Sequence, residues 1–144
     1  MGGHAWFYFV PYQPDILGAL HALRRREFEA GRYHPVVRFP MDPGAPSPGA
    51  QHASIEEALE ASDADGTRSI LDMERIGQSP DSGVVVPLPP EQLEELYGTR
   101  QPTRKMIEQN MDFLEDIERG QGVYVIAYTQ GSPSEIFFSG ISYD

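Results

Sequence analysis

Histidines and closely spaced carboxylates are the residues of this sequence best suited to chemistry. His34 and His52 bracket a long proline-rich segment, and Asp72 and Glu74 stand two apart in a stretch that we predict to be a strand. Residues two apart on a strand point to the same face of the sheet. An imidazole that meets paired carboxylates can act as a general acid or base. These four residues are therefore the candidates for catalysis.

The segment from residue 61 to residue 72 partly matches the calcium loop of an EF-hand. Asp63, Asp65, Gly66 and Asp72 fall where that loop has two ligands, its invariant glycine and its last ligand. The first ligand position is Ala61, and the last has Asp where the loop needs a bidentate Glu. None of the four histidines has the i, i+4 spacing of a metal-binding helix. We expect a polar turn here, with no metal and no cofactor.

The sequence contains no cysteine. That excludes disulfides, thiolate metal sites and a cysteine nucleophile. The common phosphate-binding, serine-hydrolase and zinc-deaminase motifs are also absent from the sequence. These absences favour a protein that is not an enzyme, while the enzymatic alternative stays open.

Negative charge is the most unusual feature of the composition. The 144 residues carry a formal net charge of −11, more than the magnitude of about 2–8 that keeps a small domain soluble. Residues 1–40 hold five arginines against three acidic side chains, so the excess lies in the remaining chain. Such a surface repels nucleic acid and anionic membranes and attracts basic proteins.

The region from 91 to 118 is predicted to form an acidic surface. Glu108, Asp112 and Glu115 recur at i, i+4 and i+7 in a predicted helix, and Glu94 and Glu95 lie in the helix before it. The plain interpretation is a solvated helix face, and the functional one is a surface that binds a partner. These five residues are the predicted partner-binding set.

The only basic cluster combines the run from Arg24 to Arg26 with Arg32, His34 and Arg38. Cations near the end of a helix stabilise the helix dipole. The alternative is a site for a phosphate or a carboxylate.

Hydrophobic spacing and capping residues predict the secondary structure. Strands are expected at 4–12, 36–39, 68–76, 84–86, 123–128 and 135–142, the last two joined as a hairpin. Helices are expected at about 15–30, 54–61 and 90–98, with a longest one from Thr103 to Gly120. Residues 40–52, with four prolines and two glycines, are expected to be a flexible loop.

These elements predict one α+β domain over residues 1–144. Because the chain ends in a hairpin, we expect a mixed or antiparallel sheet with helices mainly on one face. The N-terminus lacks the basic and apolar regions of a secretory signal, and no apolar run could span a bilayer. We therefore expect a cytoplasmic protein that does not enter membranes.

Three functions are compatible with the sequence, of which a subunit of a larger assembly, paired through its aromatic strand ends, is the least specific. The first is an acidic protein-binding module, such as an immunity or antitoxin-type inhibitor or an adaptor, that docks on a basic partner. The alternative is a small enzyme or ligand-binding protein with a pocket between the sheet and the 40–52 loop. In that case Tyr12 and Arg38 would join the four catalytic candidates.

Overall fold

The structure is a computed structural model that describes residues 3–42 and 44–144. Pro43 of the predicted loop, and Met1 and Gly2 of the N-terminal segment, lie outside the described residues. In chain order the strands and α-helices are β1 (Ala5–Pro11), α1 (Ile16–Ala30), α2 (Ile55–Ser62), β2 (Arg75–Ile76), β3 (Val84–Pro87), α3 (Pro90–Tyr97), α4 (Arg104–Gln109), β4 (Gly122–Thr129) and β5 (Ser132–Ile141). Short 3-10 turns are η1 (Asp63–Asp65), η2 (Ile70–Asp72) and η3 (Asp112–Asp116).

The five strands form one mixed sheet in the order β1-β5-β4-β3-β2. β5 pairs antiparallel with both β1 and β4, whereas β3 pairs parallel with β4 and with β2. The β4–β5 hairpin turns at Gln130 and Gly131, both with positive φ, as the tightest two-residue hairpin turns require. The α+β class, the mixed sheet and the C-terminal hairpin are confirmed.

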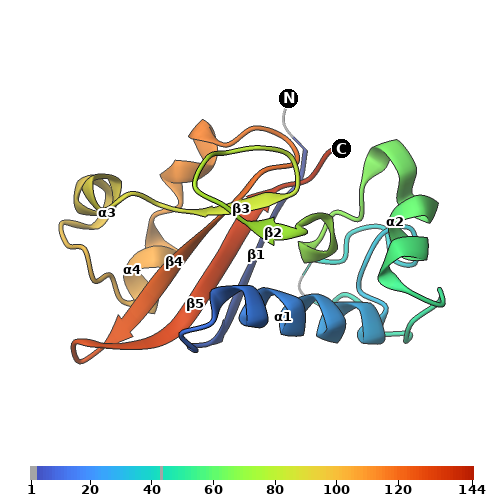
Figure 1. Ribbon diagram of the computed structural model, residues 1–144, viewed down its shortest axis with the longest axis horizontal. Helices are drawn as coiled ribbons and strands as arrows, with labels where there is room; N and C mark the ends of the chain where they lie inside the picture. Colours follow the sequence, from blue (N-terminus) through green and yellow to red (C-terminus); the bar gives the residue numbers. More distant parts are fainter. Residues whose placement is uncertain (1–2, 43) are drawn as a thin grey trace.

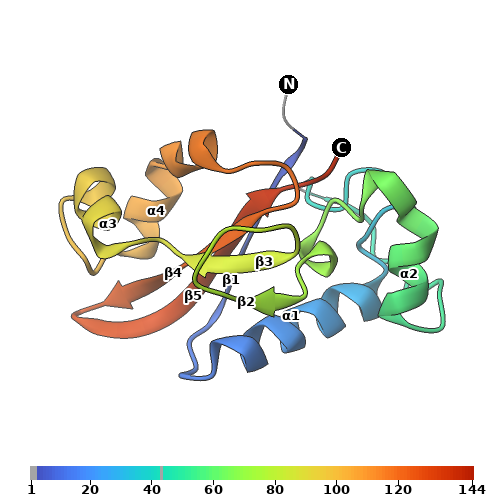
Figure 2. The ribbon, with the colours of Figure 1, turned by 45° about the horizontal axis from the view of Figure 1, so that its top comes forward.

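Helices lie on both faces of the sheet, where the sequence predicted them mainly on one (Figure 1). Side chains alternate along the strands, so Trp6 and Phe138 enter one cluster and Phe137 enters the other. The first cluster packs against α1, α2 and η2. The second packs against α3, α4 and η3. Figure 2 shows α3 and α4 at the end of the molecule remote from α2.

Helix starts follow their capping residues. The side chains of Asp15, Ser54 and Thr103 accept hydrogen bonds from the third residue beyond them, at the starts of α1, α2 and α4. Pro90 opens α3, and Gly98 ends it in the left-handed conformation. Four predicted helix starts are thus confirmed.

Two predicted strands were wrong. Residues 36–39 form turns, with the Val37 amide hydrogen-bonded to the Tyr33 carbonyl. In residues 68–76 only Arg75 and Ile76 are in a strand. Arg68 has a φ of 54°, so the chain leaves the extended conformation at the start of the predicted strand.

The 40–52 loop has no helix or strand in its described residues, and it is tied to the end of α1. The Gly49 amide donates to the Ala30 carbonyl, and Arg32 Nη1 donates to Ser47 Oγ at 2.7 Å. The Tyr33 hydroxyl accepts from the Gln51 amide. The loop therefore runs beside α1 and covers part of the first cluster.

Trp6 fixes the centre of the antiparallel part of the sheet. It is fully buried on β1, and its indole lies across Gly140 of β5 and Gly122 of β4. These three residues are partners in register across the three strands. A Cβ on Gly140 would come within 2.5 Å of both the indole and the Gln121 carbonyl oxygen. Only glycine fits beneath the indole at this position.

We expect Gly140→Ala to lower the free energy of unfolding by about 1–3 kcal/mol, the usual cost of overpacking a core. Urea titration followed by Trp6 fluorescence measures this. An unfolding free energy within about 0.5 kcal/mol of the wild type would contradict the packing described here.

Candidate functional site

All five residues of the predicted partner-binding set are exposed. Glu94 and Glu95 lie on α3, Glu108 on α4, and Asp112 and Glu115 on η3. The same three elements send their apolar side chains inward to the second cluster. Acidic side chains thus cover the outside of the helical layer formed by α3, α4 and η3, which we call the acidic layer.

The predicted long helix is interrupted, and this part of the prediction was wrong. α4 ends at Gln109, and Asn110 is extended, with φ −144° and ψ 102°. Asn110 Oδ1 accepts a hydrogen bond from the Asp112 amide at 3.0 Å, which closes a local turn in place of the next helical turn. Glu108, Asp112 and Glu115 therefore do not share one helix face as predicted.

Asn110 also joins the two helices of the acidic layer. Its Nδ2 donates to the Leu96 carbonyl at 3.0 Å, and its own carbonyl accepts from the Tyr97 hydroxyl at 2.8 Å. Burial and the nearby Asp112 carboxylate raise the pKa of Tyr97 to about 12. The hydroxyl is therefore protonated at neutral pH and keeps its donor role.

Ion pairs neutralise part of the layer. Arg100 Nε lies 3.2 Å from Glu94 Oε2, and Arg104 Nε lies 3.2 Å from Glu108 Oε2. Arg104 also pairs with Glu135 at 3.0 Å and lies over the Phe9 ring at 4.2 Å. Exposed pairs of this kind contribute little to stability. Three basic residues face eight acidic ones between 91 and 118, so the region remains negative.

A second acidic region lies on α2 and η1 at the other end of the molecule (Figure 1). Its exposed acidic residues are Glu56, Glu57, Glu60, Asp63 and Asp65. Charge alone therefore does not single out the layer.

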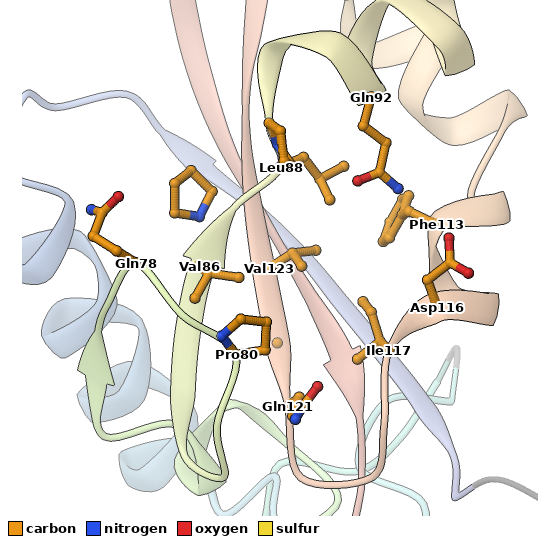
Figure 3. Close-up of a pocket in the computed structure, with 13 residues that line it drawn as sticks. Gln78, Pro80, Val86, Leu88, Gln92, Phe113, Asp116, Ile117, Gln121 and Val123 are labelled. Carbon is orange, nitrogen blue, oxygen red and sulfur yellow. The ribbon is translucent and has the colours of Figure 1, made fainter.

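A hollow of about 230 Å³ adjoins the acidic layer. Figure 3 shows Val86 of β3 and Val123 of β4 at its floor, with Phe113 and Ile117 on one side. Its remaining lining residues are Gln78, Pro80, Pro87, Leu88, Pro89, Gln92, Asp116, Gln121 and Gly122. We call this cavity the apolar hollow.

The two histidines predicted as catalytic candidates contact different neighbours. His34 Nε2 lies 3.7 Å from Asp65 Oδ2, and burial together with the Arg68 guanidinium lowers the pKa of His34. His52 Nδ1 shares a hydrogen bond of 2.8 Å with the hydroxyl of the buried Tyr33. Each imidazole therefore has a structural neighbour of its own.

The two carboxylates also differ from the prediction. Asp72 is buried, and its Oδ1 accepts hydrogen bonds of 2.8 Å from both the amide and the hydroxyl of Thr67. Its Oδ2 is buried and has no hydrogen-bond partner among the described residues. Glu74 is exposed. Asp72 lies in η2 and Glu74 beyond it, so they do not project together from one strand as predicted.

Neither of the two hollows described beside the 40–52 loop brings the six residues of the alternative function together. The hollow beside that loop is lined by Arg38 and by none of the other five. The neighbouring hollow, between β1 and residues 39–42, contains none of the six. Tyr12 lies at the hairpin end of the sheet, where its amide binds the Ser134 carbonyl.

The basic cluster has structural partners. Glu27 of α1 is buried, and both Arg26 and Arg32 bind its carboxylate, at 2.9 and 2.7 Å. Burial would raise the pKa of Glu27, but hydrogen bonds from these two arginines hold it below its usual value. Arg24 reaches the Leu71 carbonyl at 2.9 Å. Three of the arginines thus serve the fold.

Within residues 3–42 and 44–144, no group of three or more histidines and carboxylates could hold a metal ion. No helix in the described part of the chain is long and apolar enough to cross a membrane.

Comparison with known proteins identifies no relative. Neither a family model, nor a curated protein, nor a solved structure matches this chain. Any functional interpretation therefore depends on the site itself.

Sequence reasoning missed the apolar hollow. It predicted one continuous helix from Thr103 to Gly120, whereas Phe113 is the fully buried side chain of the separate turn η3. The break at Asn110 changes which residues face inward. An Asn side chain often accepts a hydrogen bond from the backbone amide two residues later and so starts a turn. Asn110 was therefore the available clue.

The raised pKa of Asp72 makes the stability of the fold depend on pH. Burial raises its pKa in the folded state, and the hydrogen bonds from Thr67 oppose that rise only in part. A folded pKa above the unfolded value of about 3.9 means that stability is lost as the pH rises through the folded pKa. The folded protein therefore carries a charging cost at neutral pH.

We expect the unfolding free energy of Asp72→Asn, relative to the wild type, to increase as the pH rises from about 4 towards neutrality. Urea titrations at several pH values measure this difference. Thr67→Val, which removes a donor to the carboxylate, should enlarge the pH effect. If the difference in unfolding free energy between Asp72→Asn and the wild type stays constant or falls as the pH rises, the prediction is wrong.

Proposed function

We propose that this chain is an acidic protein-binding module that docks on a cationic surface of a partner protein, as an immunity or antitoxin-type inhibitor or as an adaptor. One observation carries the proposal. The five predicted partner-binding residues are all exposed on the acidic layer, and the layer's apolar side chains are anchored in the second cluster. The charge is thus held on a packed support.

A rigid support matters because binding costs free energy for every group that must be ordered. Asn110 and Tyr97 tie α3 to the end of α4, and Ile107 and Phe113 are buried beneath the layer. The carboxylates therefore project from a backbone that is already fixed. Electrostatic complementarity of this kind supplies fast association and specificity.

The placement of the other candidates supports this function over catalysis. General acid–base chemistry needs the base within hydrogen-bond reach of a substrate in a shared site. His34, His52 and Asp72 each have a separate structural contact, and Arg38 alone reaches the hollow by the loop. The described residues bring no three of the six together around that hollow.

Salt dependence is the first property to test. Immobilised protein should capture a basic protein from lysate of its native host at low ionic strength, and mass spectrometry identifies that protein. With the purified partner, we expect association to slow steeply between about 0.1 M and about 1 M salt, where the screening length falls from about 10 to about 3 Å. A rate that does not change with salt contradicts electrostatic docking.

Charge reversal then locates the surface. Replacing Glu94, Glu95, Asp112 and Glu115 by Lys should lower the association rate with that partner by about 10- to 1,000-fold. The matched control reverses four exposed acidic residues elsewhere: Glu29, Glu56, Glu57 and Glu60.

The control changes the net charge equally but leaves the layer intact, so we expect a much smaller effect. Circular dichroism and urea titration establish that both variants fold. Equal losses would mean that only net charge matters. A loss confined to the control would place the interface on α1 and α2 and overturn the assignment.

A further inference from the structure

The apolar hollow lies directly beside the charged surface of the acidic layer. Val86, Val123 and Phe113 are buried side chains that line this cavity of about 230 Å³. Figure 3 shows Gln92 of α3 and Asp116 of η3 on the side of the hollow that the acidic layer forms. Two elements of the layer are therefore also walls of the hollow.

The size of the hollow limits what it can hold. Its volume of about 230 Å³ is below the range of about 300–1,000 Å³ that is usual for small-molecule and cofactor pockets. A cavity of this size with an apolar floor accommodates one large side chain. Such pockets are where the few strongly binding residues of a protein partner are usually placed.

The polar groups of the hollow indicate what should surround that side chain. Asp116 is the one charged lining residue, and Gln78, Gln92 and Gln121 supply neutral amides. The neighbouring residues Asp112 and Glu115 add negative charge on η3, and Glu91 and Glu95 add it on α3. A cation beside the bound side chain is favoured here, and an anion is repelled.

We propose that the apolar hollow binds one large apolar side chain from a cationic segment of the partner protein, with an adjacent Lys or Arg placed at Asp116. This inference rests on the proposed function, because it assumes a basic protein partner. It adds the chemistry of the contact: an apolar anchor flanked by positive charge.

A model peptide tests the proposal without the natural partner. The probe has phenylalanine between two pairs of lysines, and both ends are blocked. It is titrated to millimolar concentration into the methyl-labelled full chain, observed by NMR. We expect saturable shifts of the methyl signals of Val86, Leu88, Ile117 and Val123, with signals of the α2 residues Ile55 and Leu59 as internal references.

Control peptides separate the two parts of the anchor. Serine in place of phenylalanine should abolish the methyl shifts in the hollow. Glutamate or serine in place of the lysines should lower the affinity of the peptide at least about 10-fold. Equal binding of the serine-flanked peptide would overturn the proposal in favour of a neutral apolar ligand. Shifts that depend on protein concentration alone would assign the hollow to a second copy of the chain and overturn it too.

Two variants test whether the peptide binds in the hollow. Gln92→Trp, at a half-buried position on the rim, should occupy the hollow and reduce peptide affinity by about 30-fold, the loss typical of a removed anchor. Asp116→Asn should reduce the affinity less and remove part of its salt dependence. Unchanged affinity in Gln92→Trp, with a wild-type amide spectrum outside α3 and the hollow, would overturn the assignment, as would no methyl shift at millimolar peptide.

The failure of this inference is distinguishable from the failure of the proposed function. If the phenylalanine-centred lysine peptide shifts the backbone amide signals of Glu94, Glu95 and Asp112 but not the methyl signals of the hollow, the acidic layer binds cations and the hollow takes no anchor. If the natural partner binds Gln92→Trp normally but loses the charge-reversed layer, the same conclusion holds. If the partner binds the charge-reversed layer normally, the proposed function itself fails.

Discussion

The rest of the structure depends on how one buried carboxylate folds back a short segment. Asp72 Oδ1 accepts both the amide and the hydroxyl of Thr67, and this closes residues 66–73 into a tight buried turn. Groups from three other parts of the chain bind that turn. The His34 amide donates to the Thr67 carbonyl, Arg24 donates to the Leu71 carbonyl, and the Tyr8 hydroxyl accepts from the Ile70 amide. The turn therefore joins α1, β1 and the segment after α1 into the first cluster.

This arrangement explains why the chemically promising residues of the sequence serve structure. A buried charged group must be paired or hydrogen-bonded, because desolvation otherwise costs several kcal/mol, roughly, per ion. Glu27 meets this requirement with two arginines, and Asp72 meets it with Thr67 on one oxygen only. Arg24, Arg26 and Arg32 of the basic cluster, and the Asp72 carboxylate, are thereby part of the packing on the α1 side of the sheet.

Local signals in the sequence predicted the ends of the helices well, but two segments with β-rich composition were wrongly predicted to be strands. Asp15, Ser54, Thr103 and Gly98 act through their nearest neighbours, so the elements they begin or end are where the sequence placed them. Val36–Phe39 and Arg68–Ile76 have β-rich composition, but local hydrogen bonds close turns there instead, from the Val37 amide to the Tyr33 carbonyl and from the Thr67 amide to the Asp72 carboxylate. Exposure of the acidic set was predictable from charge. The hollow was not, because its walls come from segments far apart in the sequence, among them Gln78, Val86 and Phe113.

The two faces of the mixed sheet are covered differently. On the first face, α1 and the buried turn fill the space above Trp6, Tyr8 and Phe138. On the second, short helices interrupted at Asn110 cover the sheet above Phe137 and Val125, and a hollow remains beside them over Val86 and Val123. A continuous helix from Thr103 would carry its carboxylates along one straight line. Because the layer is interrupted at Asn110, η3 instead places Phe113, Asp116 and Ile117 along one side of an apolar cavity, so that one carboxylate and two apolar side chains lie next to each other there.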